Sequence, residues 1–263
     1  MKKEKLYRVF SHLPELLTDR LTLRKMMVID AQDMYEYACR SDVTKYLTWN
    51  PHPDKAYTKE YLQYLGNRYA AGMFYDWAIV YEPDCKMVGS CGFTSFNCPS
   101  DSAEVGYVLN PDYWGKGIAS EALGRVLRFG FEDLRLHRIE AKFMMGNDAS
   151  RRVMERCGMT FEGYLREAML VKGSYVTVGI CSVLADECTA KKWVTLGAIH
   201  FFIGGIQWQK TANWNSGRKS WRERRPSRIC TRRSARSRRR ICATNGLRKR
   251  QRMTAISTWQ NCL

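Results

Sequence analysis

The stretch from Pro111 to Leu123, PDYWGKGIASEAL, places two glycines and a lysine where an apolar strand pattern changes to a helix pattern. The residues before it, AEVGYVLN, alternate apolar and polar side chains as a half-buried strand does. The first turn of a helix has unpaired N–H groups and the positive end of the helix dipole, so it can bind an anion. Glycine lets the backbone approach such an anion closely and allows a positive φ. The sequence therefore predicts a strand, an anion-binding turn and a helix, in this order.

Two common phosphate-binding motifs do not fit these glycines. A Walker A loop needs Ser or Thr after its lysine, whereas Gly117 follows Lys116, and its first glycine would fall on Asn110. The dinucleotide-binding fingerprint would read Gly115, Gly117 and then Ser120, where glycine or alanine is required. The spacing therefore excludes both motifs as the explanation of the turn.

The charge of the chain is divided unevenly. The formal net charge is +17, but residues 188–263 contain 19 of the 43 basic residues and only one of the 26 acidic residues, Glu223. Residues 1–187 are therefore close to neutral. We expect a single folded domain over residues 1–187 and a basic, disordered extension over residues 188–263. A block of like charges without a hydrophobic period cannot bury enough apolar surface to fold.

The extension has two interpretations. An arginine-rich segment can fold onto nucleic acid, and it would contact phosphates non-specifically at low salt in any case. Its mixture of Trp, Cys and Arg-Ser equally suits an out-of-frame or fusion extension without a selected role. An RNA-binding protein that acts through this extension is therefore one alternative function for the chain.

The remaining composition favours a cytoplasmic protein with reduced thiols. The ten cysteines show no CxxC spacing and are scattered through strand and helix patterns, which argues against a disulfide framework or a metal site. The N-terminus is basic but lacks the apolar segment of a signal peptide. The apolar segment from Trp193 to Ile206 is shorter than the roughly 18 residues of a membrane-spanning helix, so no transmembrane span is expected.

The periodicity of apolar residues predicts an α/β (α+β) domain with a mixed sheet and helices on both faces. Strand and helix patterns follow the order β-α-α-β-β-β-α-β-α-β-β, which indicates such layers. Asp30 is expected to cap the first helix, and Gly158 to end the last one. The predicted strands cover residues 19–26, 103–110, 137–147, 161–167 and 174–184, with two more within 76–96 around a turn at 82–86; after the helix that follows Asp30, the predicted helices cover 58–71, 117–134 and 151–157.

Four separated motifs resemble the acetyl-coenzyme A site of the GNAT N-acetyltransferases. In order, within residues 14–187, they are AEVGYVLN, PDYWGKGIASEAL, RIEAKFMMGN and NDASRRVMERCGM. The leading TDRLTLR at residues 18–24 is similar to the T-x-R-L-x-L-R of the branch that acetylates ribosomal proteins at alanine or serine. Trp114 stands where the superfamily pattern has Gln or Arg, a replacement typical of this branch. The resemblance implies a GNAT fold, whose mixed central sheet splays between two strands.

The resemblance also implies where acetyl-CoA binds, and it implies no metal. The amides of residues 115–119 would hold the pyrophosphate, with added positive charge from Lys116 and from Arg151 or Arg152. Backbone groups of residues 108–110 would pair with the pantetheine arm like an added strand. The local sequence leaves structural roles open, because each arginine can be a solvated helix residue and Asn147 can simply end a strand. The residues assigned to the cofactor are Val108, Leu109, Asn110, Gly115, Lys116, Gly117, Ile118, Ala119, Asn147 and Arg152.

Transfer of an acetyl group to an amine needs a proton acceptor for the amine and a proton donor for the thiolate. The resemblance implies Glu104, on the strand beneath the acetyl group, as the general base and Ser150, near the sulfur, as the donor. Both also have structural interpretations, because Glu104 can face solvent on an alternating strand and Ser150 can cap a helix. Tyr107 and Tyr164 are alternatives for proton transfer.

The acceptor is the least constrained part of the site. The expected function is acetyl-CoA-dependent acetylation of a primary amine, with the N-terminal α-amino group of a ribosomal protein as the first expectation. Small amines such as polyamines, amino acids or antibiotics are the alternative acceptors on the same fold. In this fold the first two helices and the last hairpin form the acceptor pocket, which here would include Trp49, His52, Tyr57, Tyr61, Arg166 and Lys172.

Overall fold

The computed structural model describes residues 3–188, 200–203 and 206–209. The chain divides into two units, one of residues 1–193 and 259–263 and one of residues 194–258. The second unit contains, among the described residues, two short antiparallel strands, β9 (His200–Ile203) and β10 (Ile206–Gln209). Apart from residue 188 and these two strands, the predicted basic extension, 188–263, lies outside the described residues. Its disorder and its contact with nucleic acid therefore stay predictions. The domain boundary after residue 187 stays a prediction as well.

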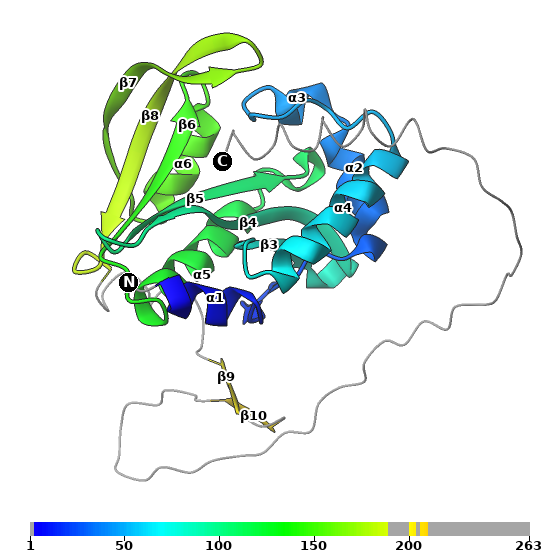
Figure 1. Cartoon of the computed structure of the whole chain (residues 1–263), viewed down its shortest axis with the longest axis vertical. Coiled ribbons are helices and arrows are strands. Elements are labelled where there is room, and N and C mark those ends of the chain that lie inside the picture. The colour runs from blue at the N-terminus through cyan, green and yellow to red at the C-terminus, as the bar shows by residue number, and fades with distance from the viewer. Residues whose placement is uncertain (1–2, 189–199, 204–205, 210–263) are drawn as a thin grey trace, which may run out of the picture. The chain divides into compact units, whose positions relative to one another are not determined.

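The first unit contains a sheet with helices packed on both of its faces (Figure 1). This is the α/β class that the sequence predicts. Its elements in chain order are α1 (Lys3–Phe10), β1 (Leu16–Leu17), β2 (Leu21–Arg24), α2 (Ala31–Ala38), α3 (Ser41–Thr44), α4 (Lys55–Ala70), β3 (Asp76–Tyr81), β4 (Lys86–Asn97), β5 (Ser102–Leu109), α5 (Ile118–Glu132), β6 (Arg138–Met144), α6 (Asp148–Arg156), β7 (Thr160–Val171) and β8 (Ser174–Leu184).

The strand order of the sheet is β1-β2-β3-β4-β5-β6-β8-β7. β5 and β6 run parallel, whereas the other neighbouring strands of this sheet run antiparallel. The parallel pairing begins at Ser102 and Arg138 and ends at Val105 and Ala141, although β5 continues to Leu109 and β6 to Met144. The two strands therefore separate in the middle of the sheet, which confirms the predicted splay.

Aromatic side chains show which helices cover each face of the sheet. Trp77 of β3 is fully buried, and its ring centroid lies 5.9 Å from that of Phe10 in α1 and 5.5 Å from that of Phe129 in α5. On the opposite face, the Tyr69 hydroxyl of α4 donates to the carbonyl oxygen of Asp76 at 2.7 Å. The Trp77 side chain thus places α1 and α5 on one face of the sheet, and α4 lies on the other (Figure 1).

Asp30 does not cap α2 with its side chain, contrary to the sequence prediction. Its carboxylate accepts two hydrogen bonds from the Arg24 guanidinium, at 2.7 and 2.8 Å, and a third from the amide of Met27 at 2.8 Å. A bidentate arginine satisfies a buried carboxylate better than a single helix amide does. Asp30 therefore ties β2 to the start of α2 instead.

Two elements at the N-terminus, α1 and β1, have no counterpart in the sequence prediction. Only Leu6 and Phe10 of α1 are buried, and two apolar positions in a basic octapeptide give little periodicity to detect. α4 begins at Lys55, three residues before its predicted start, because Asp54 caps it by accepting from the amide of Tyr57 at 2.7 Å. Gly158, with a φ of 81°, follows the end of α6 as predicted.

Over the described residues, every helix is too short or too polar to cross a lipid bilayer. Within the same part of the chain, no three His, Cys, Asp or Glu side chains converge in a way that could hold a metal ion.

Candidate active site

The centre of the candidate site is the open seam between β5 and β6. The amide of Asn110 donates to the carbonyl of Val88 at 2.7 Å, so it points toward β4. Backbone groups alternate along a strand, which directs the amides of Tyr107 and Leu109 toward the seam. The carbonyl of Leu109 accepts from the Trp114 indole N–H at 2.9 Å. Among the predicted pantetheine partners, Leu109 thus has its amide at the seam, whereas Val108 and Asn110 direct theirs toward β4.

The turn between β5 and α5 has the backbone that an anion site needs. Gly115 and Gly117 both have a φ of 75°, in the left-handed region that favours glycine. A Cβ at Gly115 would have no atom within 4 Å, and one at Gly117 would have only the Arg20 Nη2 at 3.7 Å. Gly117 directly precedes α5, and no side chain caps the first turn of that helix. Open space therefore lies beside uncapped amides, including those of Ile118 and Ala119, and this fits the predicted pyrophosphate site.

Arg20 and Glu121 form an ion pair that is hydrogen-bonded to the backbone of this turn. The Arg20 Nη2 lies 2.6 Å from the Glu121 Oε2, and the Thr18 hydroxyl donates to Glu121 Oε1 at 2.6 Å. Arg20 also donates through Nη1 to the carbonyl of Lys116 at 3.2 Å. Glu121 is thus turned away from the anion site, as a carboxylate near a phosphate must be. The Lys116 ammonium lies 4.6 Å from the centroid of the Tyr113 ring, at the edge of the turn.

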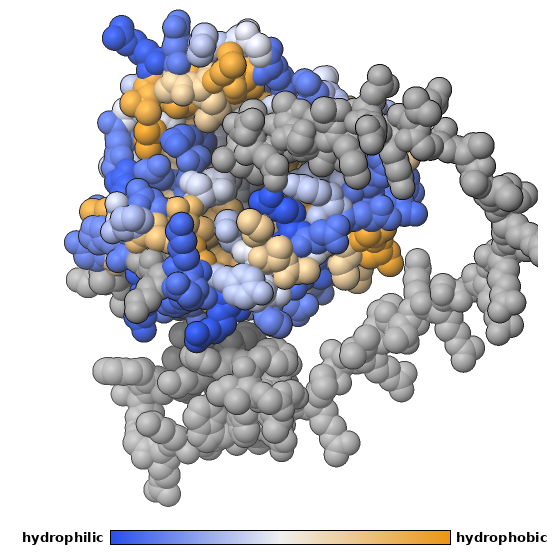
Figure 2. Space-filling model, viewed as in Figure 1, coloured by the Kyte–Doolittle hydropathy of each residue, from blue (hydrophilic) through white to orange (hydrophobic). Residues whose placement is uncertain are grey.

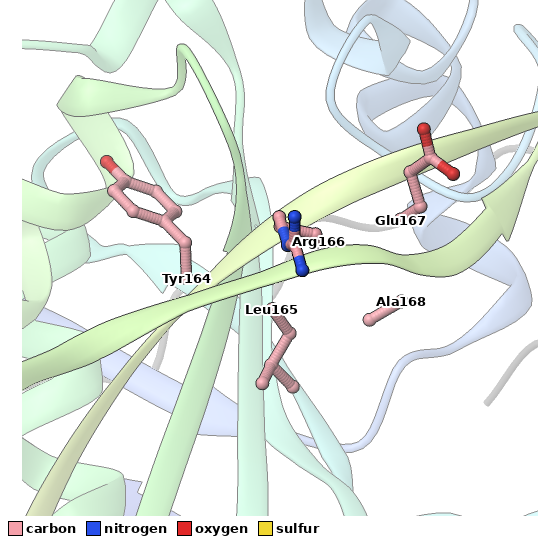
Figure 3. Close-up of a pocket in the computed structure, with 5 residues that line it drawn as sticks. All are labelled: Tyr164, Leu165, Arg166, Glu167 and Ala168. Atoms are coloured by element: carbon pink, nitrogen blue, oxygen red, sulfur yellow. The ribbon is translucent and has the colours of Figure 1, made fainter.

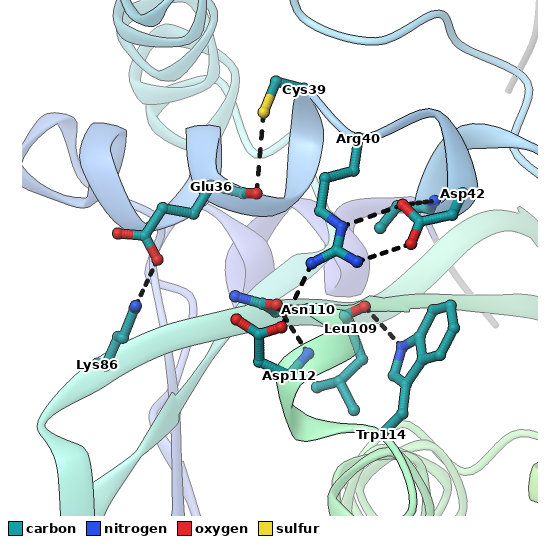
Figure 4. Close-up of polar contacts among 10 residues, drawn as sticks. Glu36, Cys39, Arg40, Asp42, Lys86, Leu109, Asn110, Asp112 and Trp114 are labelled. Carbon is teal, nitrogen blue, oxygen red and sulfur yellow. Dashed lines mark hydrogen bonds and ion pairs between the residues drawn. The ribbon is translucent and has the colours of Figure 1, made fainter.

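Asn110 shapes the entrance to the turn with its side chain (Figure 4). Asn110 is buried, and its Oδ1 accepts from the amide of Asp112 at 3.1 Å. Arg40, which follows α2, donates to Asp42 at 2.7 Å and to Asp112 at 3.3 Å. These bonds connect the α2–α3 segment to the turn. The sequence indicated only a backbone role for Asn110.

Asn147 and Ser150 lie at the start of α6, beside the seam. Asn147 caps this helix, because its Oδ1 accepts from the amide of Ser150 at 3.2 Å. The Ser150 hydroxyl lies 2.8 Å from the hydroxyl of Tyr107, which also donates to the carbonyl of Ser150 at 2.9 Å. Burial raises the pKa of Tyr107 above its usual range, so its hydroxyl stays protonated at neutral pH. Ser150 is therefore paired with Tyr107, and the helix cap is Asn147.

Glu104 lies on β5 in the stretch that is still paired with β6. Its carboxylate accepts from the Lys142 ammonium of β6 at 2.6 Å, and both side chains are partly buried. Glu104 is two residues before Gly106, so both point to the face of the sheet opposite to Tyr107. Glu104, the predicted general base, is therefore already paired with the Lys142 ammonium group.

The two arginines of α6 differ in what they contact. Arg151 donates to Glu155 at 2.8 Å, and its guanidinium carbon lies 4.2 Å from the centroid of the Phe161 ring. Arg152 is exposed and forms no hydrogen bond or ion pair with the rest of residues 3–188. Of the two, Arg152 is thus the one that can turn toward a phosphate.

The predicted aromatic residues of the acceptor pocket gather around His52. Its ring centroid lies 5.3 Å from that of Trp49, 4.9 Å from Tyr57 and 5.8 Å from Tyr61. His52 is buried, and its Nδ1 lies 2.8 Å from the hydroxyl of Thr58. Burial lowers the pKa of His52 to about 4, so the ring is neutral at pH 7.

The β7–β8 hairpin supplies the other side of the predicted pocket. Residues Tyr164–Ala168 of β7, including Arg166, line a groove of about 740 Å³ (Figure 3). Apolar side chains are exposed at this end of the sheet (Figure 2), and Leu170 is 56% exposed. Lys172 donates to the carbonyl of Thr44 at 2.6 Å and so ties the hairpin to the end of α3. Lys172 therefore has a structural contact, whereas Arg166 lies in the groove.

Asp76, the first residue of β3, is a polar residue that sequence reasoning missed. Its Oδ2 accepts from the Ser90 hydroxyl at 2.9 Å, whereas its Oδ1 is buried without a hydrogen-bond partner among the described residues. Burial raises the pKa of Asp76 to about 7. An aspartate between a loop and an apolar strand looks like an ordinary turn residue in sequence, so its hydrogen bond with Ser90 gives no signal.

Comparison with known proteins supports the resemblance seen in the motifs. Residues 20–160 match the family described as acetyltransferase (GNAT) domain. An uncharacterized N-acetyltransferase of Bacillus licheniformis, p20, is 34% identical over 65% of this chain and 97% of its own length. YdaF of Bacillus subtilis, provisionally named a ribosomal N-acetyltransferase, is 27% identical over 67% of this chain and 97% of its own. A GNAT-family acetyltransferase structure from Bacillus anthracis, 28% identical, covers 66% of this chain and 99% of its own, with a TM-score of 0.59.

Proposed function

The chain belongs to the GNAT family of N-acetyltransferases, and from this membership we propose that it acetylates the N-terminal α-amino group of a protein. Enzymes of this family use acetyl-CoA as the acetyl donor. The observation that carries the acetyl-transfer part of the proposal is the open seam between β5 and β6, with the uncapped start of α5 beside it. Both features are what a thioester with a long amide-bearing arm and a pyrophosphate requires.

In this proposal the turn and the seam hold the donor. The amides from Gly115 to Ala119 bind the pyrophosphate, and Lys116 and Arg152 add positive charge at the edge of the site. The backbone of residues 108–110, chiefly the amide of Leu109, pairs with the pantetheine arm as an added strand does. The exposed face of the Asn147 side chain, which also caps α6, lies next to this arm.

Proton transfer in this proposal is divided between the two faces of the sheet. Acetyl-CoA supplies a thioester carbonyl, whose carbon bonds to the amine nitrogen as the C–S bond breaks. On the face that carries α5 and α6, the Ser150 hydroxyl, backed by Tyr107, donates a proton to the departing thiolate. On the opposite face a carboxylate takes the proton that the amine loses. Glu104 is the base that the motifs imply, and Lys142 holds it in place.

The choice of a protein N-terminus as acceptor is supported by the aromatic cluster and by the similarity to YdaF. Trp49, Tyr57 and Tyr61 surround a neutral His52 and can frame the first residues of an extended peptide. An α-amino group has a pKa of about 8, so part of it is already neutral at pH 7. The match to YdaF points to a ribosomal protein as the substrate.

The test is an acetyl-transfer assay on the full chain with acetyl-CoA, followed by thiol release and mass spectrometry of the acceptor. Peptides that begin with Ala or Ser are compared with the same peptides carrying a blocked N-terminus, and with spermidine and free amino acids. The proposal predicts acetylation of the free N-terminus and none of the blocked peptide. A higher kcat/KM for spermidine than for any peptide would replace it with the small-amine function.

A further inference from the structure

Three residues on neighbouring strands form a row that leads to the seam. Asp76 of β3 is directly opposite Gly92 of β4, and Gly92 is directly opposite Gly106 of β5. Gly106 is the first residue of β5 beyond the last pair with β6, at Val105. Residues directly opposite each other in antiparallel strands share a face of the sheet. Asp76 therefore lies at the level of the seam, with no side chain on either glycine between them.

The carboxylate of Asp76 occupies the space beside the first glycine of this row. A Cβ at Gly92 would lie 2.8 Å from Asp76 Oδ1 and 2.3 Å from its Cα, so position 92 admits only glycine. Adjacent strands are about 4.8 Å apart, which puts Gly106 one strand spacing beyond Gly92. Gly106 is thus two strand spacings, about 10 Å, from Asp76, so a proton passes between Oδ1 and an amine at the seam through a bridging water.

Asp76 lacks the cation that a buried carboxylate needs. Within residues 3–188 no Lys, Arg or His side chain forms an ion pair with it, and Oδ1 accepts no hydrogen bond. Glu104, on the same face, already holds Lys142 at 2.6 Å. Removing a carboxylate from water without a partner is costly. Asp76 is therefore the carboxylate on this face that can accept a positively charged ligand.

The groups that face Asp76 are neutral and mostly aromatic. They come from α2 (Tyr37), α4 (Tyr61 and Tyr69) and β4 (Ser90, with Cys91 on the other face). Within the described part of the chain, the Tyr37 hydroxyl, like Asp76 Oδ1, is buried without a hydrogen-bond partner. Tyr61 also contacts the His52 cluster, with ring centroids 5.8 Å apart.

We propose that Asp76 draws the ammonium group of the acceptor amine to the seam and takes its proton at Oδ1 through a bridging water, a role that rests on the proposed acetyl transfer. The N–H bond breaks, its proton moves to the carboxylate, and the freed electron pair of the nitrogen forms the bond to the carbonyl carbon. The C–S bond then breaks, and the thiolate takes a proton from the Ser150–Tyr107 pair. The nitrogen gives up its second proton as the amide forms, and that proton restores the pair, so the net release is the one proton that Asp76 passes to solvent. Asp76 is thus a catalytic residue on the amine side, and Glu104 is held by Lys142.

The test compares Asp76→Asn, Ser90→Ala and Glu104→Gln in the full chain, with Asp19→Asn as a surface control of the same charge change. Each variant is assayed over pH 5–9 with the best acceptor found among the peptides, spermidine and free amino acids of the acetyl-transfer assay. Acetyl-CoA binding is measured by calorimetry. Asp76→Asn is expected to lower kcat/KM by about 100-fold, the scale of a lost general base, with an acetyl-CoA Kd within twofold of the parent. Asp19→Asn is expected to match the parent.

Ser90→Ala gives an independent readout if Asp76→Asn fails to fold. The bond from Ser90 lowers the pKa of Asp76, so its removal should shift the acidic limb of the kcat/KM profile to higher pH. A parent-like profile for Ser90→Ala, or a 100-fold loss in Glu104→Gln with activity kept in Asp76→Asn, would overturn the inference. A parent chain that binds acetyl-CoA but acetylates no amine of the panel would instead overturn the proposed function.

Discussion

The hydroxyl of Tyr107 on β5 lies 2.8 Å from the hydroxyl of Ser150 on α6, across the seam where β5 and β6 part. Tyr107 also donates to the carbonyl of Ser150 at 2.9 Å. Since its single proton is used in that bond, the Ser150 hydroxyl can donate to Tyr107 or to a group in the seam. The pair therefore places one movable proton beside the predicted position of the thiolate.

Tyr107→Phe and Ser150→Ala should each lower kcat by roughly 10- to 100-fold, the lower range of a lost proton donor. Acetyl-CoA affinity should change little, because neither side chain contacts the pyrophosphate turn. The double variant should be no slower than the slower single variant, since the two hydroxyls act as a unit. Steady-state kinetics of the three variants measure this.

Tyr175→Phe is the matched control for Tyr107→Phe, because Tyr175 is 69% exposed on β8. It should keep the parent's kcat. If the loss of kcat in the double variant equals the product of the losses in the two single variants, Tyr107 and Ser150 act separately.

Glu121→Gln should weaken acetyl-CoA binding several-fold, although the Glu121 side chain is turned away from the anion site. The substitution removes the charge that holds Arg20 at 2.6 Å, and Arg20 in turn holds the carbonyl of Lys116. Loss of a partly buried charged hydrogen-bond network should also cost about 1–3 kcal/mol of unfolding free energy. Glu132→Gln is the control on the same helix, because its pair with Arg128 spans 4.0 Å and Glu132 is 69% exposed. Equal Kd values for both variants would contradict the role of Arg20 in shaping the turn.

Asp76→Asn should stabilise the protein at high pH while it slows the enzyme. The folded-state pKa of Asp76 is about 7, above the value of about 3.9 in an unfolded chain. Between these values the folded state binds more protons than the unfolded state, so the free energy of unfolding falls as pH rises from 4 to 7. Asparagine does not ionise, and the variant should gain about 1–3 kcal/mol at pH 8 and little at pH 4.

Denaturant unfolding of parent and Asp76→Asn at pH 4, 6 and 8 measures this difference. A stability gain that is the same at all three pH values would mean that ionisation of Asp76 does not cause it.

Local patterns were enough to predict most of the fold. The bounds of β8 are those predicted, Ser174–Leu184, whereas the splay between β5 and β6 was expected only from the resemblance to the GNAT family. The glycine turn was found because a positive φ beside a helix start requires a residue type that the sequence shows directly. α1 was missed because its two buried residues, Leu6 and Phe10, depend on distant aromatic partners.

Side-chain partners could not be predicted in the same way. Asp30 looked like a helix cap, but the short turn between β2 and α2 brings the Arg24 guanidinium within 2.7 Å of it. Asp76 gave no signal at all, since its burial and its two glycine neighbours on β4 and β5 arise only from the register of the sheet. The composition and the hydrophobic period of a segment predict whether it forms a helix or a strand. The environment of a carboxylate depends on how the chain folds around it, which the sequence pattern does not show.

The most direct measurement is a calorimetric titration of acetyl-CoA into the full chain, beside Gly117→Glu and Gly66→Glu. Gly117 has a φ of 75° at the start of α5, whereas Gly66 lies exposed in α4 with no atom within 4 Å of an added Cβ. Glutamate at 117 places a carboxylate at the anion site and strains the turn. The account predicts binding by the parent and by Gly66→Glu, and none by a Gly117→Glu protein that unfolds cooperatively. Parent-like binding by a folded Gly117→Glu variant would contradict the placement of the pyrophosphate at this turn.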